Sequence, residues 1–146
     1  LRIDSNGKKI WDKSYKTLTN KAYNEITNSI MLSNNNILIS EIWNGVLCID
    51  TNGKKAWEKI FPEGKESYGL AEMNNQLFFL SSSDLNKGGL KSEDAYGNSD
   101  FWLLVTDLLG NKVWDKIFHG SSFERPGRIV ANNDKILIYK NKILET

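Results

Sequence analysis

Short apolar runs alternate with polar turns along the chain, and one such pattern occurs three times. The opening stretch LRIDSNGKKIWDK returns as LCIDTNGKKAWEK from Leu47 and as LLVTDLLGNKVWDK from Leu103. In each copy an apolar run leads to an aspartate, a tight turn follows, and a second run carries a tryptophan. Short apolar runs bounded by turn residues are typical of β-strands. The pattern therefore predicts a hairpin in each copy.

The three copies share the spacing D-x-x-G-x-x-x-W. Glycine supplies the positive φ that a short hairpin turn needs, and aspartate can accept hydrogen bonds from turn amides. One large ring per copy at a fixed register predicts that each tryptophan lies between adjacent units, with Tyr15, Phe61 and Phe118 extending that contact. We interpret the shared residues as a structural repeat motif, and they are Asp4, Gly7, Trp11, Asp50, Gly53, Trp57, Asp107, Gly110 and Trp114.

The remainder of each copy predicts a second hairpin. It reads SIMLSNNNILIS, SYGLAEMNNQLFFLS and GRIVANNDKILIYK, with asparagine-rich turns between apolar runs. Convincing helical periodicity is missing, so we expect essentially no helix. The tryptophans lie 46 and then 57 residues apart, a spacing found in propeller blades and other stacked repeats. We predict an all-β fold of about three four-stranded antiparallel, propeller-type blades in a single domain, within a larger propeller. The repeat units are approximately 1–46, 47–102 and 103–146.

Composition narrows the classes of partner. A net charge of +1 with scattered lysines argues against a nucleic-acid partner. Apolar runs of about five residues, such as FWLLV, are far shorter than the ~20 needed for a membrane span. Cys48 is the only cysteine, which excludes an internal disulfide, and its apolar strand predicts burial.

The segment Ser81–Asp100 is a polar, glycine-rich insertion relative to the first copy. It matches a calcium loop poorly, because Gly88 and Ala95 stand where oxygen ligands belong. We favour a surface loop, with a partner contact or an ion site as alternatives. We assign no metal and no cofactor. The candidate loop residues for a ligand or ion are Asp84, Asn86, Glu93, Asp94 and Asp100.

Other chemically distinctive residues favour a structural interpretation. His119 is the only histidine and lies near Ser121, Ser122 and Glu124, but neighbours along a loop seldom converge as a catalytic set. We therefore predict no catalytic residue. Trp43 and Trp102 lie in apolar strands, which favours core packing over stacking on a sugar or a peptide.

With three registers in agreement, the D-x-x-G-x-x-x-W pattern resembles the tryptophan-docking repeat of PQQ-like, or quinoprotein-like, β-propellers. The third copy, GNSDFWLLVTDLLGNKVWDKIFHGSS, is similar to repeats of exported bacterial propeller-like proteins. The alanine that precedes the aspartate in many quinoprotein repeats is missing here, and HG replaces GG after the third tryptophan strand. The resemblance implies a propeller of an exported, periplasmic or cell-surface protein, often without enzymatic activity. No counterpart of the quinone-binding residues is identifiable.

These observations predict a non-enzymatic binding or scaffold segment with a protein or carbohydrate ligand. The alternative is a fragment of a propeller enzyme, a quinone-dependent dehydrogenase or a hydrolase, whose active site lies in other blades. Propellers typically have 4–8 blades, so three units do not readily close a ring. Three arrangements stay open at this point: further blades on both sides, which we favour, a second chain that completes a six-bladed ring, or an open array with capped ends.

Overall fold

A computed structural model describes residues 1–16, 18, 25–84, 86–96, 100–119, 126–132 and 134–140. Within these ranges the chain forms twelve strands and no helix, which confirms the predicted all-β, blade-like fold. The first six strands are β1 (Arg2–Ile3), β2 (Lys9–Trp11), β3 (Ile26–Met31), β4 (Ile37–Glu41), β5 (Gly45–Ile49) and β6 (Lys55–Ile60). The last six are β7 (Glu66–Met73), β8 (Gln76–Ser83), β9 (Asp100–Asp107), β10 (Lys112–Phe118), β11 (Pro126–Asn132) and β12 (Lys135–Lys140).

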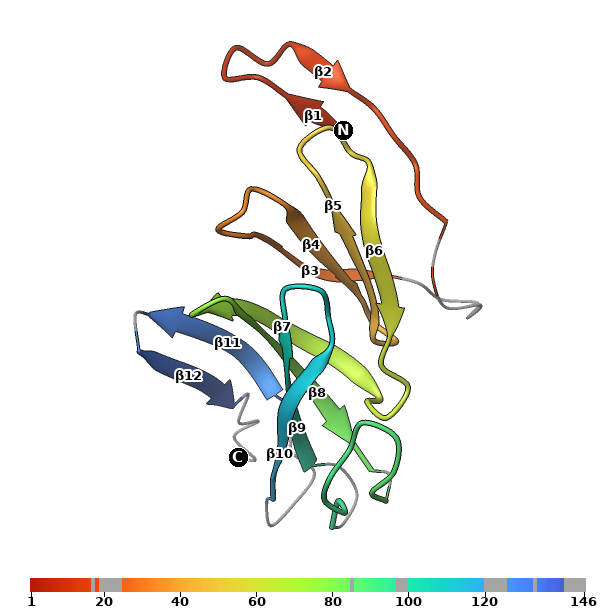
Figure 1. The fold of residues 1–146 in the computed structure, drawn as a ribbon, viewed down its shortest axis with the longest axis vertical. Helices are drawn as coiled ribbons and strands as arrows, with labels where there is room; N and C mark the ends of the chain where they lie inside the picture. Colours follow the sequence, from red (N-terminus) through yellow and green to blue (C-terminus); the bar gives the residue numbers. More distant parts are fainter. Residues whose placement is uncertain are drawn as a thin grey trace, which may run out of the picture.

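The strands form two antiparallel four-stranded sheets, in the orders β3-β4-β5-β6 and β7-β8-β9-β10, and two separate hairpins, β1-β2 and β11-β12. Figure 1 shows the groups following one another, with β1-β2 at one end beside the turn between β5 and β6. The D-x-x-G turns at Asp50 and Asp107 join the third and fourth strands of the two complete sheets, and the turn at Asp4 joins the two strands of the β1-β2 hairpin. The repeat units of the sequence, which begin at the strand before the aspartate, are therefore out of phase with the sheets.

The β7-β10 sheet is covered on both faces, because successive residues of a strand point to opposite sides. On β8, Leu77 and Phe79 belong to one buried cluster, whereas Phe78 and Leu80 belong to another. The first cluster is shared with the β3-β6 sheet, and the second is shared with the β11-β12 hairpin. Burial on both faces explains why β8 and β9 read as nearly continuous apolar runs.

Candidate functional site: the tryptophan joints and the long loop

The three D-x-x-G turns have the same geometry. In each, the glycine amide donates to the carbonyl of the aspartate at 2.9–3.1 Å, and φ of the glycine is between 70° and 81°. The aspartate Oδ1 accepts the amides two and four residues further on at 2.8–2.9 Å. The amide of Lys54 thus lowers the pKa of Asp50, and the amide of Asn111 lowers the pKa of Asp107. The motif residues therefore fix the turn itself.

Each of these hairpins also carries an extra residue directly before its tryptophan. Pairing runs from Ile49–Lys55 to Cys48–Trp57 in one hairpin, and from Thr106–Lys112 to Val105–Trp114 in another. The first hairpin shifts in the same place. Bulges of this kind bend a strand and redirect the side chain that follows. The shift recurs in all three copies and places the tryptophan on the face toward the next group of strands.

Two of the tryptophans bind the turn of the following copy. The indole N–H of Trp11 donates to the carbonyl of Thr51 at 2.9 Å, and that of Trp57 donates to the carbonyl of Leu108 at 3.0 Å. In both cases the acceptor directly follows the motif aspartate. A Cβ placed on Gly53 would lie 3.1 Å from a ring carbon of Trp11, and one placed on Gly110 would lie 3.4 Å from a ring carbon of Trp57, so each ring lies directly against the glycine of the next turn. We call this contact the tryptophan joint.

Side chains that follow Trp11 and Trp57 add further hydrogen bonds to the joint. Lys59 Nζ donates to the carbonyl of Gly110 at 2.8 Å, and the Tyr15 hydroxyl donates to the carbonyl of Gly53 at 2.8 Å. Burial, followed by the charge of Asp50, raises the pKa of Tyr15. Phe61 instead packs in the core against Phe79, with the ring centres 5.0 Å apart. The positions four residues after the tryptophan therefore serve different contacts.

At two places only one side of a tryptophan joint is present, and we call these places half-built joints. A Cβ on Gly7 would meet no atom of the described residues within 4 Å, although its turn matches the other two. Trp114 is 41% exposed and has its ring edge against Phe78. It lines an open groove of about 510 Å³ between the β7-β10 sheet and β12, together with Phe101, Phe118 and Ile138.

Residues 84–99 connect β8 to β9 and are called the long loop here, whereas Ser81–Ser83 and Asp100 of the predicted insertion belong to the two strands. The candidate oxygen ligands of this region do not come together. Asp84 pairs with Lys65 at 2.8 Å, and Glu93 pairs with Lys116 at 2.8 Å. Asp94 accepts the amide of Lys87 at 2.7 Å. Asp100 accepts the amide of Tyr96 at 2.6 Å and lies 3.0 Å from His119 Nδ1, while Asn86 is exposed. Among the described residues, no three His, Cys, Asp or Glu side chains form a group that could hold a metal ion.

A buried lysine provides a positive charge inside this loop. Lys91 is buried, and its Nζ donates to the Ser83 hydroxyl at 2.8 Å. Burial lowers the pKa of Lys91, while the charges of Asp100, Asp94, Asp84 and Asp115 oppose that shift. Three of the candidate oxygen ligands therefore already have an ammonium group nearby. The burial of Lys91 was not predicted from the sequence, where the only signal is a lysine after the turn residues KGGL.

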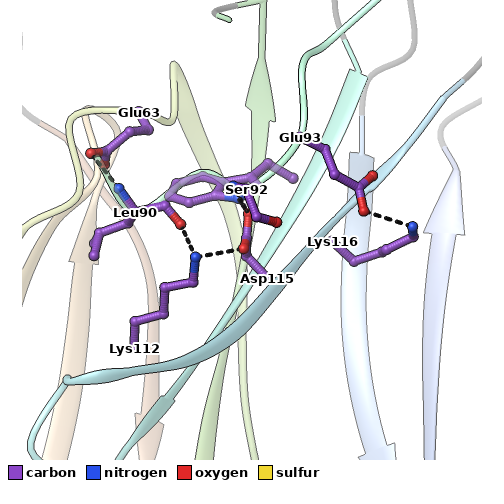
Figure 2. Close-up of polar contacts among 8 residues, drawn as sticks. Glu63, Leu90, Ser92, Glu93, Lys112, Asp115 and Lys116 are labelled. Carbon is purple, nitrogen blue, oxygen red and sulfur yellow. Dashed lines mark hydrogen bonds and ion pairs between the residues drawn. The ribbon is translucent and has the colours of Figure 1, made fainter. Parts of the chain in front are cut away.

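The loop is held against the sheet by Asp115, which follows Trp114 and points to the opposite face. Its side chain is 1% exposed and pairs with Lys112 Nζ at 2.7 Å. Asp115 Oδ2 accepts the amide of Ser92 and the indole N–H of Trp102, both at 2.9 Å (Figure 2). Burial raises the pKa of Asp115, but hydrogen bonds from Lys112, Ser92 and Trp102 outweigh it, and the net pKa is lowered.

Further contacts secure both sides of this anchor. Glu63 Oε1 accepts the amide of Leu90 at 2.9 Å, and Lys112 Nζ also donates to the carbonyl of Leu90. Figure 2 shows these contacts beside the Glu93–Lys116 pair. The segment from residue 86 to residue 96 is thus fastened to sheet residues at several points.

The remaining candidates lie in ordinary structural settings. Trp102 and Cys48 are in the core, as their apolar strands predicted, and burial raises the pKa of the Cys48 thiol. Trp43 is partly exposed and lies in the turn between β4 and β5, so the prediction that it lies in an apolar strand was wrong. His119 contacts the ring of Tyr96, with centres 4.7 Å apart. Its sequence neighbours Ser121, Ser122 and Glu124 lie outside the described residues.

No protein-family model and no curated protein matches this chain. Across the described ranges, no helix is long and apolar enough to cross a membrane.

Proposed function

We propose that this chain is a non-enzymatic scaffold and binding segment of an exported or cell-surface bacterial protein built from PQQ-like propeller repeats. The observation that carries the proposal is that the motif side chains and the acids beside the long loop make hydrogen bonds that hold the fold together. In the repeats, Trp11, Trp57 and Lys59 bind the turns of neighbouring strand groups. Asp115 on β10 and Glu63 in the connection between β6 and β7 accept hydrogen bonds from amides of the long loop. The exported location and the family are supported by the sequence resemblance alone.

One described pair has a geometry that catalysis uses elsewhere. Ser83 and Lys91 are in hydrogen-bond contact, as a nucleophile and its base are in some hydrolases. Both residues are buried, and the Ser83 hydroxyl also donates to the carbonyl of Glu63 at 2.9 Å. A substrate carbonyl cannot reach a hydroxyl in this position. The pair is better explained as support for the loop.

The loop offers a surface for a ligand at Tyr96. This ring is 68% exposed and is backed by the ring of His119, which is bonded to the buried carboxylate of Asp100. An exposed aromatic ring held from behind suits stacking against a sugar or an aromatic peptide side chain. A carbohydrate or peptide ligand is therefore proposed for this position.

Two measurements test the proposal. Glycan and peptide arrays should give a ligand whose binding falls at least tenfold in Tyr96→Ala and is retained in Tyr96→Phe, because the phenyl ring preserves stacking. Assays on ester, peptide and glycoside substrates, and on alcohols with a quinone acceptor, should show no turnover. Turnover that disappears in Ser83→Ala would overturn the non-enzymatic proposal, and binding unaffected by Tyr96→Ala would overturn the ligand position.

A further inference from the structure

We infer that the groove beside Trp114 receives the β1-β2 hairpin of a second copy of this chain, so that two chains complete each other's sheets head to tail. The inference rests on the tryptophan joint and is independent of the ligand proposed at Tyr96. It starts from the two half-built joints. Gly7 marks a turn with no ring of a described residue beside it, and Trp114 is a ring beside an open groove.

The two hairpins are complementary halves of one sheet. The β1-β2 hairpin corresponds to the third and fourth strands of the complete sheets, because it contains the D-x-x-G turn and the bulge. The β11-β12 hairpin corresponds to the first and second strands, and it packs on the β7-β10 sheet as that sheet packs on β3-β6. Together they make the order β11-β12-β1-β2, which has the same form as the two existing sheets.

The register of this shared sheet follows from the existing ones. Gln76 pairs with Met73 across a two-residue turn, as Lys135 pairs with Asn132, so Lys135 takes the place of Gln76. Gln76 faces Asp107 in the neighbouring strand, which places Lys135 opposite Asp4 of the second copy. Opposite charges at facing positions favour this pairing.

The next positions place Ile136 opposite Ile3, and Leu137 opposite Arg2. They correspond to the pairs Leu77–Thr106 and Phe78–Val105 of the complete sheet. Trp114 then lies beside the turn of the second copy, and its indole N–H reaches the carbonyl of Ser5. That carbonyl occupies the place of the Thr51 and Leu108 carbonyls in the two existing joints.

Exposure supports the same arrangement. Ile3 is 54% exposed, whereas Ile49 at the same motif position is 2% exposed. Leu137 is 54% exposed, whereas Leu38, the matching residue of β4, is 0% exposed. In the shared sheet, Ile3 and Leu1 enter the groove, and Leu137 faces the β3-β6 sheet of the second copy. The apolar side chains that the single chain leaves in solvent become core residues.

Two such joints related by a two-fold axis close a ring. Each chain contributes two complete sheets, and the two pairs of hairpins supply two more, which gives six four-stranded blades. Six lies within the usual range for propellers, and a two-fold dimer is the most common closed assembly.

Association of the 146-residue chain tests the inference. Sedimentation at protein concentrations between about 0.1 and 100 μM should show a monomer–dimer equilibrium, because the dissociation constant of an interface of this kind is expected to be about 1 μM or lower. Trp114→Ala and Ile3→Lys should each weaken the dimer at least tenfold. Ile10→Lys is the matched control, because Ile10 lies on the same hairpin and is also about half exposed. Ile10 is the bulge residue, and the corresponding residues of the complete sheets, Ala56 and Val113, are exposed.

A mixing experiment identifies the head-to-tail geometry. The Trp114→Ala variant keeps an intact hairpin, and the Ile3→Lys variant keeps an intact groove. Each variant alone should be monomeric. An equimolar mixture should form a one-to-one complex, because the hairpin of one variant can enter the groove of the other. The inference is overturned if the wild-type chain stays monomeric at 100 μM, which would leave the groove to other repeats of a longer polypeptide. It is also overturned if the mixture fails to associate, or if Ile10→Lys weakens the dimer as much as Ile3→Lys.

Discussion

The strands β6 and β10 carry nearly the same sequence, KAWEKI and KVWDKI, but the two environments are reversed. On β6, Trp57 binds the next turn, while Glu58 forms an exposed ion pair with Lys55 at 2.8 Å. On β10, Trp114 lines an open groove, while Asp115 is buried under the long loop. The local sequence of the strand therefore does not determine the contacts of the tryptophan or of the acid that follows it. The tryptophan depends on a turn of the next group of strands, and the acid depends on what covers the outer face.

The largest expected difference in stability is between the variants that remove Trp57 and Trp114. We expect Trp57→Ala to lower the free energy of unfolding by about 2–3 kcal/mol, which is at or below the low end of the cost of removing a core aromatic because Trp57 is partly exposed. Trp114→Ala should cost about 1 kcal/mol or less, since the ring has one aromatic neighbour and no described turn. Urea melts at submicromolar protein measure both, and equal costs would contradict the comparison.

The acids should show the opposite order. Asp115→Asn is expected to cost about 1–3 kcal/mol, because it weakens charge-assisted hydrogen bonds in a buried site. Glu58→Gln should change stability by at most about 0.5 kcal/mol, since exposed ion pairs contribute little. The same melts measure both variants. If Glu58→Gln were as costly as Asp115→Asn, burial by the loop would not be the source of the difference.

The pH dependence of stability sharpens the role of Asp115. Its pKa is lower in the folded chain than in the unfolded chain, so its contribution is present above about pH 4 and is lost as the pH falls through the folded pKa. The gap in unfolding free energy between wild type and Asp115→Asn should therefore shrink as the pH falls below about 4. Asp50 and Asp107, whose pKa values are also lowered, titrate in both proteins and cancel from the gap. A gap that stays constant over this range would show that the charge of Asp115 does not matter.

The smallest expected difference compares two glycines with the same backbone. Gly7 and Gly110 have φ of 81° and 75°, so Gly→Ala at either position carries a similar strain of about 1–2 kcal/mol. At Gly110 the new methyl group would lie 3.0 Å from Lys59 Cδ and 3.4 Å from the ring of Trp57. Displacing them should add about 1 kcal/mol. The extra cost should vanish when Trp57→Ala and Lys59→Ala are already present, and its persistence would place its origin elsewhere.

The sequence was sufficient to predict strands, hairpins and the absence of helix that the described residues show, because alternating apolar runs and Asn-Gly turns are local signals. It also indicated that the tryptophans lie between units. It could not identify the Leu108 carbonyl as the acceptor of Trp57, because that contact depends on how two sheets stack. Nor could it separate Asp115 from Glu58, because the two share the same local pattern.

The long loop was the hardest region to interpret from the sequence. Its acidic residues suggested an ion site as an alternative to a surface loop, but the structure distributes them among lysines and backbone amides. The decisive residue, Lys91, is recognisable only by its burial, which no periodic pattern in KGGLKSED announces. Loops that fold back onto a sheet are specified by contacts distant in sequence, such as Ser92 with Asp115.

Hydrogen exchange of the indole N–H groups tests the tryptophan joint most directly. In a ¹⁵N-labelled chain at a concentration low enough to keep it monomeric, the Nε1 protons of Trp11 and Trp57 should exchange markedly more slowly than that of Trp114, because each donates to a carbonyl of the next turn. In Gly110→Ala, the exchange of Trp57 should accelerate while that of Trp11 stays the same. Exchange of Trp57 as fast as that of Trp114 in the wild-type chain would contradict the joint and the account built on it.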